Sequence, residues 1–282
     1  MKISLEQDEE SLCFHLEPED SDIEHLKSSK IGLAGKEARI NLGGLKIESI
    51  HPDLIGLSAI LISHQFVGKE LRLQFGVSEE FLEKTNGILS KYKITSESEM
   101  SIYPNETPVN SRPGLAFSGG ADSTAALAVM PGNTIPVFMN RPMRKGSMYD
   151  SDAPIKNCEL LKQIGYDVKV VDCDLEYLRE PVGFPSDLAH AIPLILLSGD
   201  LGIDSIAFGT ILESAYGIGH EHYIDYPNGS HKRFYGTLLS AAGLQISLPV
   251  GGVSEVGTCI IVEDSPLGEL SQSCIRGKRD SP

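Results

Sequence analysis

Short apolar runs alternate with longer helical segments between residues 114 and 208. The predicted strands are Gly114–Phe117, Thr134–Met139, Val168–Val171 and Ser205–Phe208. The predicted helices between them are Asp122–Met130, Ala153–Ile164 and Leu188–Leu201. Strands that alternate with helices of this length form βαβ units, whose strands run parallel. We therefore predict an α/β domain with a parallel sheet, and ligands should bind beyond the carboxyl ends of its strands.

The first hundred residues follow a different pattern. Alternating apolar residues predict the strands Ser11–Leu16, Ala38–Leu42, Leu45–Ile50 and Leu71–Phe75. Helices are predicted at Pro52–Phe66, with proline in its first turn, and at Ser78–Thr85, with serine as its N-cap. A polar segment with three prolines, Tyr103–Pro113, has the composition of a linker. The sequence thus predicts a small α+β domain at residues 1–107 and the α/β domain at residues 108–282.

The net charge of the 282-residue chain is −15, which disfavours several partners. Proteins that bind nucleic acids or anionic membranes normally present a basic face, so neither is an expected partner. No apolar run reaches the roughly 18 residues of a membrane span, and the acidic N-terminal segment does not resemble a signal peptide. Five scattered cysteines without a CxxC pair indicate free thiols in a reducing compartment. We expect a cytoplasmic protein that acts on a small molecule.

The segment Ser118–Ser123 (SGGADS) joins the first predicted strand of the α/β domain to its helix. Two glycines let the backbone approach a ligand closely, and loop N–H groups at a helix N-terminus favour an anion. Ser118 and Ser123 add hydroxyl donors. Asp122 is expected either to cap the helix or to hold a Mg²⁺ ion that bridges phosphates. The segment predicts a phosphate site, and an ordinary strand–turn–helix junction is the alternative.

This SGGxDS segment resembles the PP-loop of the N-type ATP pyrophosphatases, also called adenine nucleotide alpha hydrolases, whose fold is HUP-like. The resemblance covers roughly residues 114–275. Members of that family cleave ATP between the α and β phosphates and attach AMP to a substrate oxygen, which nitrogen or sulfur then displaces. The resemblance implies that the pyrophosphate is held by Ser118, Gly119, Gly120, Asp122 and Ser123. It implies that the residues near adenosine are Ala116, Phe117, Phe138 and Met139.

Within the family, the segment Leu248–Cys274 looks nearest to the 7-cyano-7-deazaguanine synthase branch. Two departures stand out. That branch usually has a lysine where this chain has Ser254-Glu255, and it follows its first zinc cysteine with a CxxC pair. A Zn²⁺ site of that kind would need chain beyond Pro282. The domain at residues 1–107 is a further departure, so the deazaguanine substrate is not carried over.

Several other residues are candidates for the site. Arg141, Arg144 and Lys145 follow the second strand and could clamp phosphates or an anionic substrate, or could form a solvated basic loop. After the fourth strand, the candidate substrate or metal contacts are Gly209, Thr210 and Glu213. A metal site or a polar loop could be formed by His220, Glu221, His222 and Asp225.

Cys173 lies just past the third predicted strand, where a sulfur-transfer enzyme would need a carrier thiol. The flanking acids should raise the pKa of its thiol and make it a poor nucleophile.

The favoured function is an ATP-dependent synthetase that adenylates a carboxylate or carbonyl oxygen for attack by a nitrogen nucleophile. Asp122 would organise Mg²⁺, and Ser118 with the loop N–H groups would stabilise the leaving pyrophosphate. One alternative is ATP-dependent sulfur transfer with Cys173 as carrier. The other is a non-catalytic nucleotide-sensing or scaffold subunit. In any of these, the N-terminal domain could bind a protein partner or a second copy of the chain.

Overall fold

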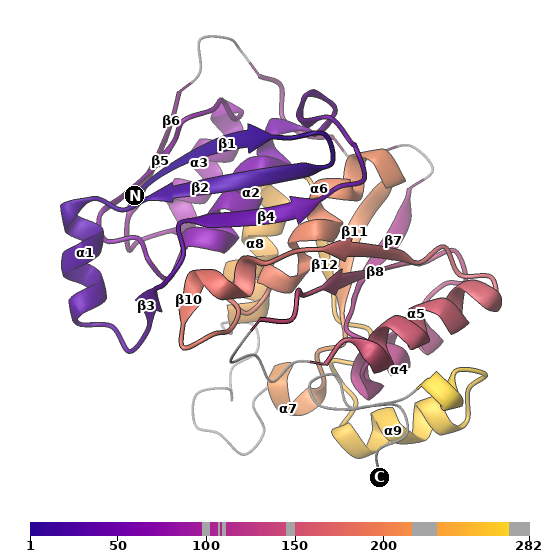
Figure 1. Ribbon diagram of the computed structural model, residues 1–282. Helices are drawn as coiled ribbons and strands as arrows, with labels where there is room; N and C mark the ends of the chain where they lie inside the picture. Colours follow the sequence, from indigo (N-terminus) through magenta and orange to yellow (C-terminus); the bar gives the residue numbers. More distant parts are fainter. Residues whose placement is uncertain (98–101, 107, 109–110, 145–149, 216–229, 271–282) are drawn as a thin grey trace. The chain divides into compact units, whose positions relative to one another are not determined.

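The computed structural model describes residues 1–97, 102–106, 108, 111–144, 150–215 and 230–270 (Figure 1). The chain forms two compact units. Unit 1 consists of Met1–Thr107, Asp172–Leu201 and Thr237–Gly243, and unit 2 consists of Pro108–Val171, Gly202–Gly236 and Leu244–Pro282. The chain therefore does not divide only once, near residue 107, as the predicted domains require. Two later segments return to the N-terminal unit.

Unit 2 contains a five-stranded sheet in the order β12-β11-β7-β8-β9. The strands are β7 (Arg112–Phe117), β8 (Ile135–Asn140), β9 (Lys169–Asp172), β11 (Ile203–Phe208) and β12 (Gln245–Ser247). β7 pairs in parallel with both β8 and β11, and β11 pairs in parallel with β12. These pairings confirm the predicted α/β fold with a parallel sheet. Successive strands are added on one side of β7 and then on the other, so the strand order reverses at β7.

The helices of unit 2 are α4 (Ala121–Val129), α5 (Asp152–Gln163), α7 (Leu212–Ala215) and α9 (Glu255–Glu263), with a π-helix at Ser230–Gly236 and a 3₁₀ turn at Gly268–Leu270. Side chains from β7, α4, α5 and α9 share one apolar core. Its members include Leu115, Phe117, Ala125, Ala126, Phe138, Cys158, Leu161 and Val262. Packing of α4 against α9 joins the start of unit 2 to its last described helix.

Unit 1 has a mixed five-stranded sheet in the order β4-β2-β1-β5-β6. The strands are β1 (Lys2–Gln7), β2 (Ser11–Glu17), β4 (Glu37–Asn41), β5 (Glu70–Leu73) and β6 (Lys93–Ser96). β2 is antiparallel to β1 and β4, whereas β5 is parallel to β1 and β6. A separate antiparallel pair joins β3 (Gly32–Leu33) to β10 (Arg179–Glu180).

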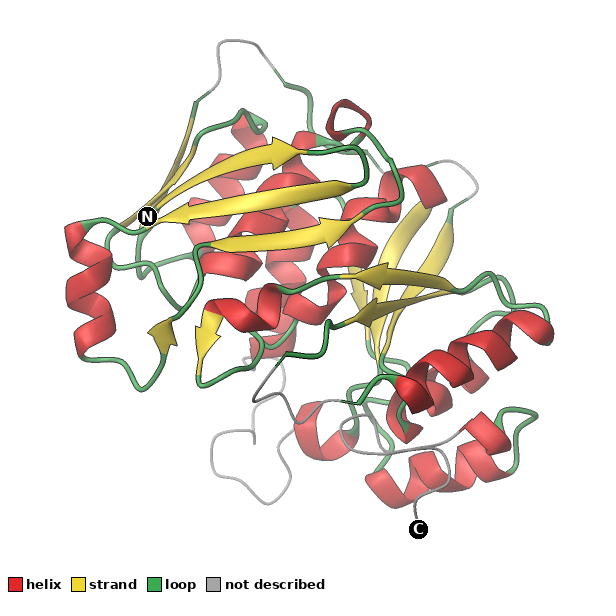
Figure 2. Ribbon diagram, viewed as in Figure 1, coloured by secondary structure: helices red, strands yellow, loops and turns green. Residues whose placement is uncertain are grey.

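The helices of unit 1 are α1 (Asp20–Lys27), α2 (Pro52–Ser63), α3 (Glu79–Ile88), α6 (Ile192–Leu201) and α8 (Thr237–Ala241), with 3₁₀ turns at Ile47–Ser49, Leu175–Leu178 and Ala189–Ala191. Figure 2 shows helices behind the β1–β2–β4 part of the sheet. Every residue of α2 from Asp53 to Ser63 is buried, and α2 contacts α6 and α8, both from late segments of the chain. Among the described residues, no helix is long and apolar enough to cross a membrane.

Three local predictions need correction. The predicted strand Leu45–Ile50 is wrong: it follows Gly43 and Gly44, both at positive φ, and contains the 3₁₀ turn Ile47–Ser49. The predicted helix at residues 188–201 starts as a 3₁₀ turn and becomes α-helical at Ile192, which places Pro193 in the first turn. The predicted linker ends inside β7, and β1 was not predicted.

Candidate functional site

The glycine-rich loop lies between the end of β7 and the start of α4. Gly119 has φ +78°, a conformation that favours glycine. A Cβ atom at this position would also lie 3.0 Å from the Cα and Cβ atoms of Pro154 in α5. Gly120 is the N-cap residue, and within the described residues no side chain caps α4 there. The helix therefore presents backbone N–H groups at a tight turn, which is an arrangement that suits an anion.

The two serines of the loop bond to each other. Ser123 Oγ accepts from the Ser118 N–H at 3.3 Å and donates to the Gly120 carbonyl oxygen at 3.1 Å. The two hydroxyl oxygens are 3.0 Å apart, and Ser118 is then the donor of that bond. Ser123 is 3% exposed, so its hydroxyl stabilises the loop through these internal hydrogen bonds and is not open to a ligand. Ser118 is only half-buried and is the serine better placed to meet a ligand.

β11 reaches the first turn of α4 at Gly209. Phe208 pairs with Ala116 of β7, so Gly209 follows directly beside the end of β7. A Cβ atom on Gly209 would lie only 2.6 Å from Ser123 N and 2.7 Å from Ser123 Cα. The loop thus lies where β7 and β11 end side by side, at the reversal of strand order. In open α/β sheets this reversal is the usual ligand site.

Asp122 is held by the last described helix of unit 2. The Thr258 hydroxyl on α9 lies 2.8 Å from Asp122 Oδ1 and 2.8 Å from the Glu255 carbonyl oxygen. Its single proton is shared between these two acceptors, and Thr258 is fully buried. Since Gly120 occupies the N-cap position, the carboxylate of Asp122 serves as an oriented group in the first turn, where the helix dipole stabilises negative charge.

Asn157 ties the loop to two other elements and was missed by sequence reasoning. Its amide nitrogen donates to the Gly119 carbonyl oxygen at 3.0 Å and to the Leu270 carbonyl oxygen at 2.6 Å. The side chain is fully buried on α5. A sequence signal existed, because Asn157 lies four residues from both Ala153 and Leu161 and so shares the apolar face of its helix.

The four residues predicted near adenosine are all buried. Phe117 and Phe138 are side by side in the sheet and belong to the core with α4 and α5, so they can meet a ligand only through their backbone. Ala116 and Met139 alternate with them and face the opposite side of the sheet, at 4% and 5% exposure.

Of the predicted substrate residues, those that the structure describes follow β8 and β11 and have different surroundings. Arg141 is half-buried after β8, Arg144 is exposed, and Thr210 is half-buried after β11. Lys145 and the histidine-rich candidates, His220, Glu221, His222 and Asp225, lie outside the described residues.

Glu213 accepts the Glu255 N–H with both carboxylate oxygens, at 3.3 and 3.2 Å. It therefore caps α9 together with Ser254, whose hydroxyl accepts the Gly257 N–H at 3.2 Å. This capping contact accounts for the position of Glu213 without a substrate.

Cys173 belongs to unit 1, where it pairs with Ile40 of β4. It is 2% exposed, and burial, followed by the charges of nearby acids, holds the pKa of its thiol far above the usual value. A buried, protonated thiol is a poor nucleophile, so this environment counts against the predicted sulfur-carrier role. The flanking acids contribute, but burial is the larger cause.

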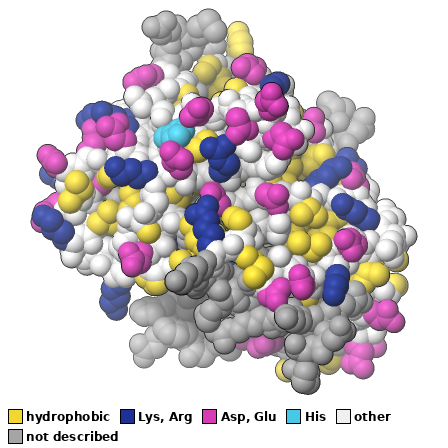
Figure 3. All heavy atoms as spheres, in the orientation of Figure 1, with side chains coloured by type: hydrophobic (Ala, Val, Ile, Leu, Met, Phe, Trp, Pro, Cys, Tyr) yellow, Lys and Arg dark blue, Asp and Glu magenta, His cyan; other side chains and the backbone are white. Residues whose placement is uncertain are grey.

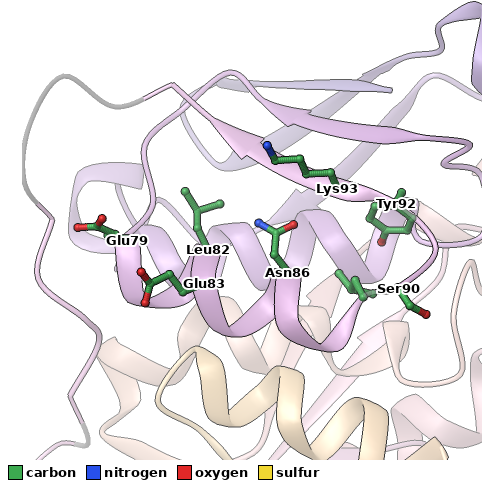
Figure 4. Close-up of a pocket in the computed structure, with 8 residues that line it drawn as sticks. Glu79, Leu82, Glu83, Asn86, Ser90, Tyr92 and Lys93 are labelled. Atoms are coloured by element: carbon green, nitrogen blue, oxygen red, sulfur yellow. The ribbon is translucent and has the colours of Figure 1, made fainter.

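An open hollow of about 640 Å³ lies on unit 1 (Figure 4). Its lining residues are Glu79, Leu82, Glu83, Asn86, Leu89, Ser90, Tyr92 and Lys93. The amide of Asn86 is already bonded to the backbone of Ile94, donating at 3.0 Å and accepting at 2.8 Å. The hollow contains none of the predicted site residues and has no nucleophile paired with a base.

Comparisons with a family model and with solved structures find similarities to this chain. Residues 234–282 match the model of a family of unknown function, DUF6395. No curated protein matches the chain in a sequence search. Among solved structures, the chain is similar to the U34-tRNA thiolase NcsA from Methanococcus maripaludis with its [4Fe-4S] cluster. The identity is 17% and the TM-score 0.40, over 72% of this chain and 67% of that one.

Proposed function

We propose that unit 2 binds ATP at Ser118–Ser123, cleaves it between the α and β phosphates and transfers AMP to an oxygen of a small molecule. The observation that carries the proposal is the glycine loop at the strand-order reversal, with Gly209 of β11 pressed against the first turn of α4. Backbone donors, the Ser118 hydroxyl and the oriented Asp122 carboxylate all belong to this loop and the first turn of α4, which supports the proposal. Cytoplasm, where ATP is abundant, is the proposed location.

Each group has a distinct part in this proposal. The N–H groups of the loop and the first turn of α4 bind the phosphates. On binding, the Ser118 hydroxyl gives up its hydrogen bond to Ser123 Oγ and donates instead to the leaving pyrophosphate. Thr258 keeps Asp122 in one orientation through the 2.8 Å hydrogen bond. A carboxylate beside phosphate oxygens is a donor set that suits Mg²⁺, so Asp122 would hold that ion, which would offset the charge of the phosphates.

The SGGxDS loop supports membership of the PP-loop ATP pyrophosphatases, and Leu248–Cys274 supports the 7-cyano-7-deazaguanine synthase-like branch as the nearest. We favour a nitrogen nucleophile for the second step. Sulfur transfer is the second candidate, because it shares the adenylation step. If it holds, the carrier is not expected to be Cys173, whose thiol is enclosed.

Product analysis with α-labelled ATP and Mg²⁺ tests the shared step, using a panel of carboxylates and purine-like bases. Asp122→Asn keeps an oxygen for Thr258 but removes the charge. The matched control is Asp152→Asn, which removes an exposed carboxylate from the first turn of α5. We expect AMP and pyrophosphate from the wild type and the control, with at least a tenfold loss in Asp122→Asn. Formation of ADP and phosphate would refute the proposal.

A second set of reactions separates the nucleophiles. Ammonium and sulfide are supplied in parallel to the adenylated acceptor, and the product is identified by mass. Incorporation of nitrogen supports the synthetase, and incorporation of sulfur supports the alternative. ATP that binds without cleavage under every condition would favour a nucleotide-sensing subunit.

A further inference from the structure

A cluster of potential metal ligands lies on the outer face of the unit 1 sheet. Leu12, Phe14 and Leu16 of β2 are buried in the core, so Cys13 and His15, which alternate with them, point to the other face. The register places Glu37 of β4 directly opposite His15.

The donor atoms of Cys13, His15 and Glu37 are close enough to share one ion. The Cys13 sulfur, one His15 ring nitrogen and a Glu37 carboxylate oxygen all lie within 4.8 Å of one another. Two ligands of a tetrahedral zinc ion are roughly 3.3–3.7 Å apart, given the usual bond lengths. His15 Nδ1 and Glu37 Oε1 are already 3.4 Å apart. Small side-chain rotations would therefore complete the three-ligand geometry.

The second nitrogen of His15 already has the partner that metal-binding histidines normally have. His15 Nε2 lies 3.1 Å from a carboxylate oxygen of Glu6 on β1. If Nε2 carries the proton and donates to Glu6, the Nδ1 lone pair faces the carboxylate of Glu37. Two lone pairs at that distance repel unless a second proton or a cation lies between them. A carboxylate that orients a histidine is also the common outer partner of a zinc ligand.

The charges around the cluster can accommodate a cation, which must displace the proton of Cys13, because burial raises the pKa of this thiol to about 11. Arg39 is opposite Cys13 in the register, but it forms an ion pair with Asp8, which offsets its charge. Cys13 is buried at 2% exposure, whereas the side chains of His15 and Glu37 are 30% and 60% exposed, so an ion can enter from solvent. Figure 3 shows a histidine on this face with both acidic and basic side chains close to it.

We propose that unit 1 binds a zinc-class divalent ion through Cys13 Sγ, His15 Nδ1 and the Glu37 carboxylate, with Glu6 orienting His15. Thiolate, imidazole and carboxylate together form a mixed donor set that Zn²⁺ accepts and that Mg²⁺ and Ca²⁺ do not. Three protein ligands leave a fourth position for water or an external ligand. This site uses different residues from the ATP loop, so either proposal can fail alone.

The test uses the full chain, stripped with a chelator and titrated with Co²⁺ and then Zn²⁺. We expect one Co²⁺ per chain with a thiolate-to-cobalt absorption band, which Zn²⁺ removes. Cys13→Ser should abolish the band, whereas Cys259→Ser, which removes an exposed thiol on α9, should not. Loss of the band in Cys259→Ser instead, or no stoichiometric binding, would overturn the proposal.

Three exposed carboxylates, Glu37, Glu17 and Glu6, give variants that should fold normally. Glu37→Gln should weaken Zn²⁺ binding at least tenfold. Glu17→Gln is the matched control, because Glu17 is an exposed carboxylate on β2 whose only described ion pair is with Lys2. Glu6→Gln should weaken binding by about tenfold or more, as expected for an outer partner. Equal affinities in Glu37→Gln and Glu17→Gln would contradict the site.

Discussion

Replacing Gly209 with alanine puts a methyl group where the structure has no room for one. The added carbon would lie 2.6 Å from Ser123 N, whereas ordinary contacts begin at 3.4 Å, so the backbone must give by about 0.8 Å (3.4 − 2.6). The opposing atoms are backbone atoms of the first turn of α4, which cannot rotate away. Overpacking of this kind costs about 1–3 kcal/mol. The displacement moves the N–H groups that we assign to the phosphates.

We expect Gly209→Ala to weaken ATP binding by roughly 10- to 100-fold, because each tenfold corresponds to about 1.4 kcal/mol. Isothermal titration calorimetry with Mg²⁺ and ATP measures the effect. Gly132→Ala is the matched control, since a Cβ atom there meets nothing within 4 Å. The reasoning would be refuted if Gly209→Ala lowered the melting temperature but bound ATP as tightly as Gly132→Ala. The loop would then be a structural junction.

Three further changes test other contacts. Thr258→Val removes the hydroxyl that bonds to Asp122 at 2.8 Å. We expect about tenfold slower AMP formation in steady-state kinetics. We also expect urea unfolding to show a loss of about 1 kcal/mol in stability. Asp53 is fully buried and accepts the N–H and the hydroxyl of Ser78 at 2.7 and 2.8 Å. Asp53→Ala should therefore lower the free energy of unfolding, measured in urea, by about 3 kcal/mol. A loss below about 1 kcal/mol would contradict this account. Burial lowers the pKa of the His64 side chain to about 4. The folded state therefore binds a proton at His64 more weakly than the unfolded state does. As a result, the stability of the fold decreases as the pH drops from about 6.5 towards 4. Between pH 7 and pH 5 the wild type should lose about 2 kcal/mol more than His64→Gln, and equal losses in unfolding curves at the two pH values would refute the assignment.

The parts of the fold that were predicted correctly depend on local pattern. Alternation of strands and helices predicted the parallel sheet, and the SGGADS segment predicted the loop between β7 and α4. Neither needs knowledge of distant contacts. The bond between Asp122 and Thr258 joins residues 136 positions apart, and no pattern around either residue reveals it.

The return of later segments to unit 1 was also hidden. The sequence of α6, IPLILLSGDL, is apolar on most of its faces and so reads as a buried helix. The sequence does not show which element packs against α6. In the structure α6 contacts α2, which is buried from Asp53 to Ser63. Each of these two helices removes the other's apolar surface from water.

Because α6 and α8 follow α2 by more than a hundred residues, α2 is synthesised long before the helices that cover it. When a ribosome has released residues 1–107, α2 has been synthesised but α6 and α8, which contact it, have not. The apolar surface of α2 therefore stays uncovered until residue 243 has emerged, when most of unit 2 has already been synthesised. Nascent chains with exposed apolar surface aggregate or recruit chaperones. A fragment cut at residue 107 should therefore be insoluble, and the N-terminal unit should acquire protease resistance only after residue 243 has emerged.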